Sequence, residues 1–93
     1  MSNQGEHRIL FYEYVDDMVE RRGPYREAHL ARIGAEREAG RIVMAGALGD
    51  PPHGGAVVFL GVPEAEIESF ARADPYMEAG LVKSWHSELW KLV

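Results

Sequence analysis

Hydrophobic residues alternate in some stretches of the 93-residue chain and follow helical spacing in others, which divides it into elements. Four runs rich in β-branched and aromatic side chains predict strands. We expect these strands at residues 8–15, 41–48, 55–62 and 81–93. Pro24 and Pro63 suit the first turn of a helix, and we expect a helix to begin at each. The first should run to about residue 39, before Gly40, and the second should end at Asp74, which precedes a proline.

The segments between these elements are polar or rich in glycine and proline. We expect frayed residues over 1–7, a charged connector over 16–23, a loop over 49–54 and one short turn over 75–80.

The order β-α-β-β-α-β predicts a ferredoxin-like α+β fold, with an antiparallel four-stranded sheet and two helices on one face. Two helices cover only one face of such a sheet. The first strand is nevertheless apolar on both sides, and the last carries Trp85 on one side and Trp90 on the other. An uncovered apolar face usually marks an interface, so we expect a homodimer packed sheet to sheet.

Each helix should turn an apolar face to the sheet. In the second helix the inward residues are Ile67, Phe70 and Ala71. In the first they are Tyr25, Ala28, Leu30 and Ile33. Gly34 lowers the helix propensity there, and close packing against a strand would explain it.

Composition narrows the class of protein. The length fits one domain over residues 1–93, and 46% hydrophobic residues are typical of a globular chain. No apolar run approaches the ~20 residues that a membrane helix needs, and no secretory signal opens the chain. The lack of cysteine excludes disulfides and thiolate metal sites, and a net charge of -5 disfavours nucleic acid. We expect a cytoplasmic protein with neither a membrane nor a nucleic-acid partner.

His29 has two interpretations. Arg26, His29 and Ile33 are three and four residues apart, so they share one helix face. Because Ile33 belongs to the expected apolar face, His29 should point toward the sheet. It is either a histidine at the edge of the core, bonded to a backbone carbonyl, or a general acid or base, since imidazole titrates near neutral pH.

Asp74 also has two. It follows Ile67 by two helical turns, so it should point toward the sheet as well. An aspartate before a proline is a good N-cap for the turn at residues 75–80. One carboxylate oxygen can cap while the other orients a histidine, so capping does not exclude an acid/base pair with His29. The chain offers no obvious nucleophile, and the pair would act on water or directly on a substrate.

Other titratable residues give weaker indications. His53 lies in the Gly/Pro loop, where it is either solvated or part of a lid. His86 and Glu88 share one face of the last strand, and Glu13 is either a paired interfacial charge or a pocket carboxylate. No nucleotide or hydrolase motif occurs, and no ligand pair has the spacing of a metal site. We therefore expect neither a metal nor a cofactor.

Three stretches together resemble the YciI-like (YCII-related) family. They are RxxHL at residues 26–30, GRIVxAGAL at 40–48 and ADPYxxAGL at 73–81. The pairing of the first and third motifs, at this separation and in this order of elements, is fairly specific. Ala47 and Leu89 depart from the family pattern, in which proline is common at both positions. The departures concern the shape of the pocket rather than the acid/base pair.

The resemblance implies a ferredoxin-like subunit that forms a dimeric α+β barrel. His29 and Asp74 match the histidine and aspartate proposed as the family's active-site pair, and Gly46 and Tyr76 match positions near the same cleft. One characterised branch removes chloride from a chlorinated hydroxyhydroquinone, and related barrels include muconolactone isomerases and cofactor-free monooxygenases. A small aromatic or lactone-like substrate is therefore implied.

Two classes of function follow. In the first, the chain is a small-molecule enzyme that uses His29 and Asp74 for acid/base chemistry in dehalogenation, isomerisation or hydrolysis. Arg26 would then pair with an anionic substrate oxygen, and Tyr12 or Tyr76 would line the pocket. The alternative is a metabolite-binding or accessory dimerisation module without catalysis, because one fold hosts unrelated functions.

Overall fold

The computed structural model describes residues 5–93, which form a four-stranded sheet and four helices. The strands are β1 (His7–Tyr14), β2 (Ile42–Leu48), β3 (Gly54–Leu60) and β4 (Val82–Trp90). The helices are α1 (Met18–Arg21), α2 (Gly23–Glu38), α3 (Glu64–Arg72) and α4 (Pro75–Glu78). The order matches the expected one, with α4 as the predicted short turn. None of the helices in this part of the chain is long and apolar enough to cross a bilayer.

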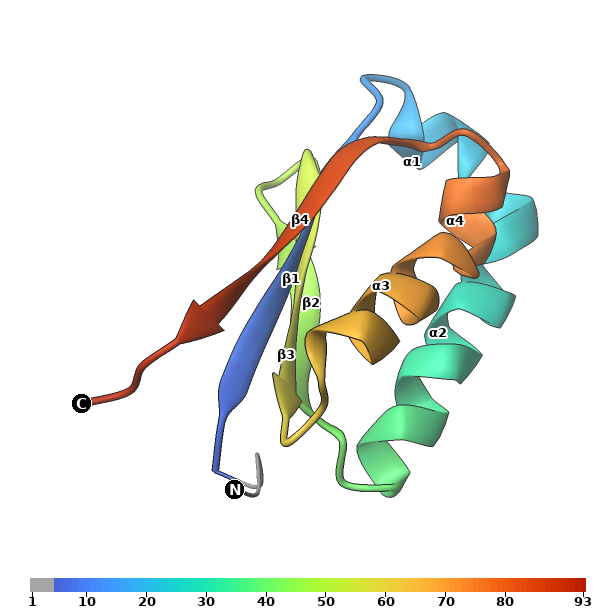
Figure 1. The fold of residues 1–93 in the computed structure, drawn as a ribbon. Coiled ribbons are helices and arrows are strands. Elements are labelled where there is room, and N and C mark those ends of the chain that lie inside the picture. Colours follow the sequence, from blue (N-terminus) through green and yellow to red (C-terminus); the bar gives the residue numbers. More distant parts are fainter. Residues whose placement is uncertain (1–4) are drawn as a thin grey trace.

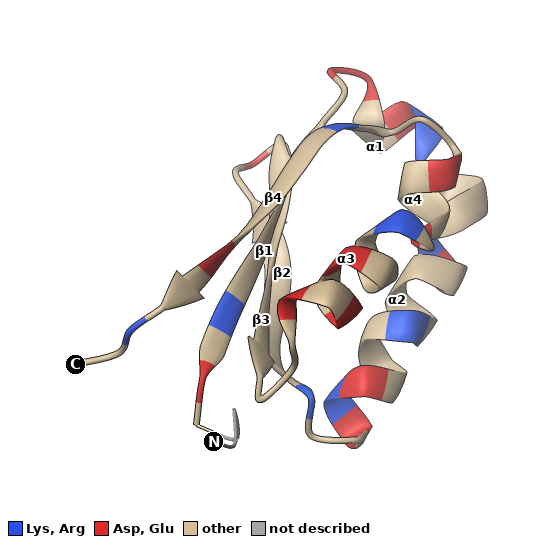
Figure 2. Ribbon diagram, viewed as in Figure 1, with Lys and Arg blue, Asp and Glu red and all other residues tan. Residues whose placement is uncertain are grey.

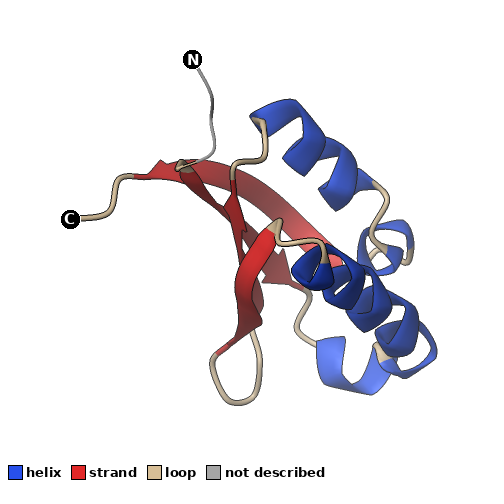
Figure 3. Ribbon diagram, turned by 90° about the horizontal axis from the view of Figure 1, so that it is seen from below, coloured by secondary structure: helices blue, strands red, loops and turns tan. Residues whose placement is uncertain are grey.

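The strands pair antiparallel in the order β2-β3-β1-β4. β3 therefore lies between β1 and β2, and β1 lies between β3 and β4. The two long helices, α2 and α3, both lie on one face of the sheet (Figure 1 and Figure 3). The predicted ferredoxin-like α+β fold is confirmed, because each helix connects two strands that are separated by a third.

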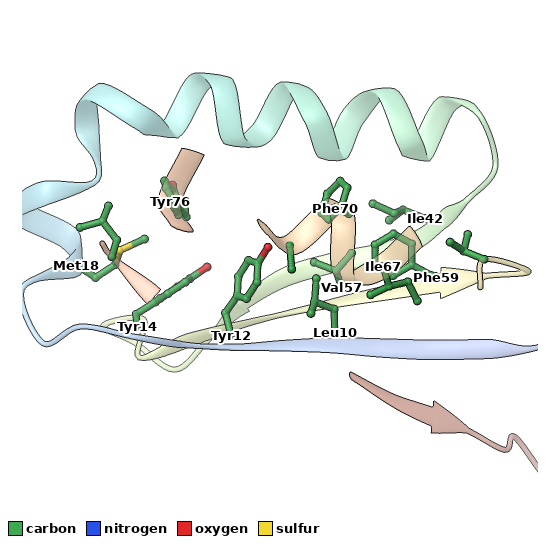
Figure 4. Packing of buried hydrophobic residues seen from close by; sticks show 13 residues of the cluster. Leu10, Tyr12, Tyr14, Met18, Ile42, Val57, Phe59, Ile67, Phe70 and Tyr76 are labelled. Atoms are coloured by element: carbon green, nitrogen blue, oxygen red, sulfur yellow. The ribbon is translucent and has the colours of Figure 1, made fainter. Parts of the chain in front are cut away.

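The hydrophobic core fills the space between the sheet and the helices. Leu10, Tyr12 and Tyr14 alternate along β1 and are buried on the helix side. In Figure 4 the two tyrosine rings rise from β1 toward the helix layer. The three residues expected on the inner face of α3 are buried as predicted: Ile67, Phe70 and Ala71. Full burial of a side chain of this size stabilises the fold by about 1.5–3 kcal/mol.

Two segments expected to lack regular structure form part of the fold. His7 pairs with Leu60 on β3 and with Trp90 on β4, so the expected fraying of residues 1–7 is wrong at His7, while residues 1–4 lie outside the described residues. The charged connector at 16–23 contains α1. Met18 is only 1% exposed there and belongs to the core cluster. One apolar residue among charges is too weak a pattern to predict a helical turn.

Smaller differences concern the ends of elements. β3 begins at Gly54, one residue earlier than expected, and ends at Leu60, since Gly61 turns the chain with a φ of 70°. Pro63 is the N-cap of α3 rather than its first residue. β4 covers Val82–Trp90, a shorter span than the expected 81–93.

Helix α2 differs most from expectation. Tyr25 and Leu30 are 40% and 43% exposed, and Ala28 is exposed too, so the predicted apolar face does not cover the core. Ile33 is half-buried, and His29 is the one residue of the helix that is buried. The reason is that a cavity separates much of the helix from the sheet. The inward face of α2 therefore mixes polar side chains with Leu30 and Ile33, and an apolar pattern alone does not reveal the polar ones.

None of the helices formed by residues 5–93 lies on the second face of the sheet (Figure 3). By the strand register, Ile9 on this face lies beside Val58, and Phe11 lies opposite His86 and stacks on it. Trp90 is on the same face and is 41% exposed. β2 and β3 contain no charged residue, and the charges of the molecule gather on the helices, the connections and strands β1 and β4 (Figure 2).

Candidate functional site

His29 and Asp74 meet at the inner face of α2, although 45 residues separate them in the sequence. The Nδ1 atom of His29 lies 2.9 Å from each carboxylate oxygen of Asp74. The two side chains are 8% and 1% exposed. A carboxylate only accepts hydrogen bonds, so we assign the shared proton to Nδ1. The lone pair of the imidazole is then on Nε2, in the form that a general base needs.

The same carboxylate caps α4 and holds β1. Oδ1 of Asp74 accepts a hydrogen bond from the backbone N–H of Tyr76 at 2.9 Å, which confirms the predicted N-cap. Oδ2 accepts a hydrogen bond from the Tyr12 hydroxyl, also at 2.9 Å. A buried charge with three donors is well satisfied, and its position is determined from three directions. The cap and the contact with His29 therefore coexist in one side chain.

Three tyrosines enclose the histidine and its carboxylate. The ring of Tyr76 stacks on the His29 imidazole with 3.9 Å between centroids, and Tyr14 meets Tyr76 edge to face at 6.0 Å. Burial, with the neighbouring Tyr76 and Asp74, raises the pKa of Tyr14 to about 12. Burial, and next the Asp74 carboxylate, raises the pKa of Tyr12 well above its ordinary value, and burial also raises that of Tyr76. All three phenols are therefore neutral at physiological pH and can donate hydrogen bonds.

A cavity of about 410 Å³ lies between α2 and the sheet, and His29 forms part of its wall. Its floor consists of small residues of β2 and β3: Ala45, Gly46, Ala47, Gly55 and Ala56. Gly34 faces the cavity from α2, and a Cβ atom there would meet no atom within 4 Å. The expected close packing at Gly34 is therefore wrong. The volume lies within the range of roughly 300–1,000 Å³ that is typical of small-molecule sites.

Several polar groups of the cavity wall have no partner within residues 5–93. Two of them are Nε2 of His29 and the hydroxyl of Tyr14. Both atoms are partly accessible. Among the described residues, the one side-chain atom that is fully buried without a partner is Nε of Arg8, which is a different atom. The Tyr14 hydroxyl lies close above Gly55, where a Cβ atom would stand 2.7 Å from the oxygen. The groups that the cavity offers a ligand thus include an imidazole nitrogen and a phenol.

The family model of the YCII-related domain matches residues 8–91. The chain belongs to the YCII-related family. The match runs from β1 to the residue after β4, and so includes every element that contributes to the cavity. Among curated proteins, none matches the sequence.

Several solved structures share this YCII-related fold. 5-Chloro-2-hydroxyhydroquinone dehydrochlorinase (TftG) from Burkholderia phenoliruptrix AC1100, in complex with 2,5-dihydroxybenzoquinone, is similar with a TM-score of 0.77 and 22% identity, over 91% of this chain and 93% of that one. A candidate antibiotic biosynthesis monooxygenase from Bacteroides thetaiotaomicron VPI-5482 is similar with a TM-score of 0.56 and 12% identity, over 95% of this chain and 89% of that one. Protein SO0527 from Shewanella oneidensis is similar with a TM-score of 0.54 and 19% identity, over 97% of this chain and 93% of that one. At these identities the likeness concerns the fold.

Most residues singled out from the sequence of this YCII-related chain lie around the cavity. The lining includes Tyr12, Arg26, His29, Gly46 and Tyr76. Asp74 is behind His29 and does not line the cavity itself. Gly46 contributes backbone to the floor. A Cβ atom there would meet nothing within 4 Å, so close approach of a neighbouring group does not require a glycine at this position.

The weaker candidates lie elsewhere. His86 and Glu88 are both exposed on the open face of the sheet, with 2.8 Å between Nε2 and a carboxylate oxygen. Glu13 accepts a hydrogen bond from Ser84 at 2.9 Å on the same face and lies 3.7 Å from Nζ of Lys83, so it is a paired charge outside the cavity. His53 is exposed in the loop between β2 and β3. Among the described residues, no three His, Cys, Asp or Glu side chains come together as a metal site requires.

Three further residues of the cavity wall have polar side chains that the sequence analysis does not single out: Tyr14, Arg22 and Arg37. A signal for each was present. Tyr14 follows Tyr12 by two residues on β1, so both side chains leave the same face of the strand. Arg22 and Arg37 stand four residues before and eleven after Arg26, which is the spacing of one helix face. Treating the helix face that contains His29 as the inward one would have found the two arginines.

Proposed function

We propose that this chain is a small-molecule enzyme in which His29 exchanges a proton with a substrate bound in the cavity. The observation that supports this most is the hydrogen bond from His29 Nδ1 to the buried Asp74 carboxylate. It leaves Nε2 with a lone pair in the wall of a cavity of about 410 Å³. In this proposal Asp74 orients the imidazole and stabilises it once protonated. The chemistry uses no metal and no cofactor.

The proposed substrate is a small aromatic or lactone-like ring. The wall formed by the Tyr12, Tyr14 and Tyr76 rings suits a flat ligand, because aromatic rings favour stacked and edge-to-face contacts. The structural similarity to TftG, whose solved complex holds 2,5-dihydroxybenzoquinone, supports a ligand of this size. Loss of HCl from a chlorinated ring diol needs a base for the proton, while the chloride carries away the bonding electrons. Isomerisation and hydrolysis make the same demand on His29.

An activity screen tests the proposal. The purified protein is incubated with 5-chloro-2-hydroxyhydroquinone, with chloride release as the readout, and with a panel of small lactones and aryl esters. We expect turnover of at least one class above the rate in buffer. A parallel thermal melt with 2,5-dihydroxybenzoquinone reports binding alone. If this compound raises the melting temperature while none of the panel is turned over, the chain is a metabolite-binding module instead. If neither effect is seen, the proposal fails.

We further propose that two copies pair through the open face of the sheet. Ile9, Phe11, Met44 and Trp90 give this face an apolar character that is unusual for a free surface. Light scattering after size exclusion at micromolar concentration should give twice the mass of 10.4 kDa. Phe11→Glu should shift the protein to the single-chain mass, because it would bury a charge in the interface. A wild-type mass of one chain would contradict the dimer.

A further inference from the structure

The charges around the cavity differ in sign from the protein as a whole. The chain carries 15 acidic and 10 basic residues, a net charge of -5. The charged lining of the cavity is nevertheless basic throughout, and it consists of Arg22, Arg26 and Arg37. No Asp or Glu side chain belongs to the lining formed by the described residues. The cavity is therefore a cationic site in an acidic protein, which favours an anionic ligand.

The cavity arginines also differ from the others in their contacts. Each of the five arginines outside the cavity has a partner: Arg8 with Glu6, Arg21 with Asp17, Arg32 with the Phe70 carbonyl, Arg41 with Glu36 and Arg72 with Glu68. The three cavity arginines have neither a carboxylate within 4.0 Å nor a hydrogen-bond acceptor among residues 5–93. Their guanidinium groups are thus available to bind an oxygen anion in the bidentate geometry that arginine favours.

Two of these arginines stand at the same end of the cavity as His29. Arg22, Arg26 and His29 are spaced four and three residues apart along one helix face. Burial raises the pKa of both Tyr14 and Tyr76. The Arg22 guanidinium lies near both phenols, and its positive charge partly offsets that rise. Arg37 follows Arg26 by eleven residues, about 16 Å along the helix axis. It therefore belongs to the far end.

We propose that Arg22 and Arg26 bind a carboxylate of the substrate and so hold its ring against Nε2 of His29. The substrate class is a small hydroxylated aromatic or cyclic carboxylic acid. The hydroxyl of Tyr14, which has no partner in the described part of the chain and lines the same end, donates a further hydrogen bond to the bound oxygen. This inference rests on the proposed acid/base function of His29, and it names the group on the substrate that positions the reacting atom.

Calorimetric titration with two matched probes tests the proposal without any turnover. The probes are 2,5-dihydroxybenzoate and its neutral isostere 2,5-dihydroxybenzamide, in about 0.1 M salt, where the Debye length is about 10 Å. We expect the acid to bind at least about ten-fold more tightly than the amide, since hydrogen bonds to charged groups are worth that ratio or more. The double variant R22Q/R26Q should lose this preference. R37Q is the control at the far end: it removes one positive charge, as the single variants R22Q and R26Q each do, and it should keep the preference within about three-fold.

A third variant separates this proposal from the proposed function. H29Q should retain the preference for the acid, because the arginines are unchanged, whatever happens to turnover. Arginine-dependent binding in a protein that turns over no compound would leave the carboxylate site standing while the enzymatic proposal fails. Turnover together with equal affinities for acid and amide would overturn the carboxylate site alone. Equal losses in R37Q and R22Q/R26Q, or no binding of either probe, would also overturn it.

Discussion

Replacing His29 by glutamine is expected to lower kcat by about 100-fold or more while the protein stays folded, because positioned proton transfer typically contributes that much. Glutamine occupies a similar volume and can donate a hydrogen bond to the Asp74 carboxylate. The buried charge therefore keeps a partner, and the main structural loss is the stacking contact with Tyr76, worth about 0.5–1.5 kcal/mol. The side chain lacks a basic nitrogen, so the proton cannot be taken from the substrate.

The matched control is H53Q, which makes the same substitution at an exposed histidine outside the cavity. Its turnover should equal that of the wild type. A second check uses H29A with imidazole added to the buffer. Because His29 lines the cavity, the free base can enter the vacated space, and partial recovery of turnover would identify the imidazole itself as the working group. A folded H29Q protein with turnover within about three-fold of the wild type would remove His29 from the mechanism.

The architecture was predictable because strand alternation and helix boundaries are local signals. β1 is an example, since Leu10, Tyr12 and Tyr14 leave one face of a strand by geometry alone. The connection between β1 and α2 was not predictable in the same way. Met18 is the single apolar anchor of α1 in a charged segment, and its burial depends on core space that other elements create.

The face of α2 shows why apolar patterns mislead beside a cavity. An apolar face predicts which side of a helix packs on a sheet. Here Leu30 is exposed by 43% because it lines the cavity together with Arg26 and His29 instead of packing on the sheet. A helix that borders a ligand site keeps polar groups inward because the ligand or water satisfies them, not the core. His29 was placed on the sheet side only through its spacing from Ile33, which holds for both packed and cavity-lining faces.

The prediction that His29 and Asp74 meet combines two kinds of information. Helical phase pointed both side chains toward the sheet, and the family resemblance related them to one site. The hydrogen bond from Tyr12 to Asp74 had no comparable signal, because a contact across 62 residues depends on the three-dimensional placement of β1 and α4. From the sequence, Tyr12 is predicted only to line the pocket.

Asp74→Asn is expected to lower kcat by about 10³–10⁴-fold, the scale seen when a catalytic histidine is held in the wrong tautomer. The asparagine oxygen can still accept the hydrogen bond from the Tyr76 backbone, which leaves the amide nitrogen to face His29. An amide N–H₂ donates, and a protonated Nδ1 would meet it donor against donor at the 2.9 Å position of Oδ2, so we expect Nδ1 of His29 to become the acceptor. The proton then moves to Nε2, and the cavity loses the lone pair that acts as the base.

This substitution separates the orienting role of Asp74 from its capping role. Asparagine and aspartate are about equally good N-caps, so the start of α4 should be retained. Asp74→Ala, in contrast, removes the cap and leaves the donors of Tyr12, His29 and Tyr76 without their shared acceptor. We expect it to reduce the free energy of unfolding by about 1–3 kcal/mol or more, since buried unsatisfied donors are costly. The melting temperature should therefore fall much further for Asp74→Ala than for Asp74→Asn.

Nitrogen-15 chemical shifts of the His29 ring give a readout that a purely structural role would not change. The wild type should show the proton on Nδ1, and Asp74→Asn should show it on Nε2. A variant that keeps the Nδ1 proton and full turnover would reduce Asp74 to a helix cap. A shift of the proton together with the loss of turnover would tie the catalytic rate to the tautomer. The buried carboxylate would then act on the substrate only through His29, as its position behind the imidazole requires.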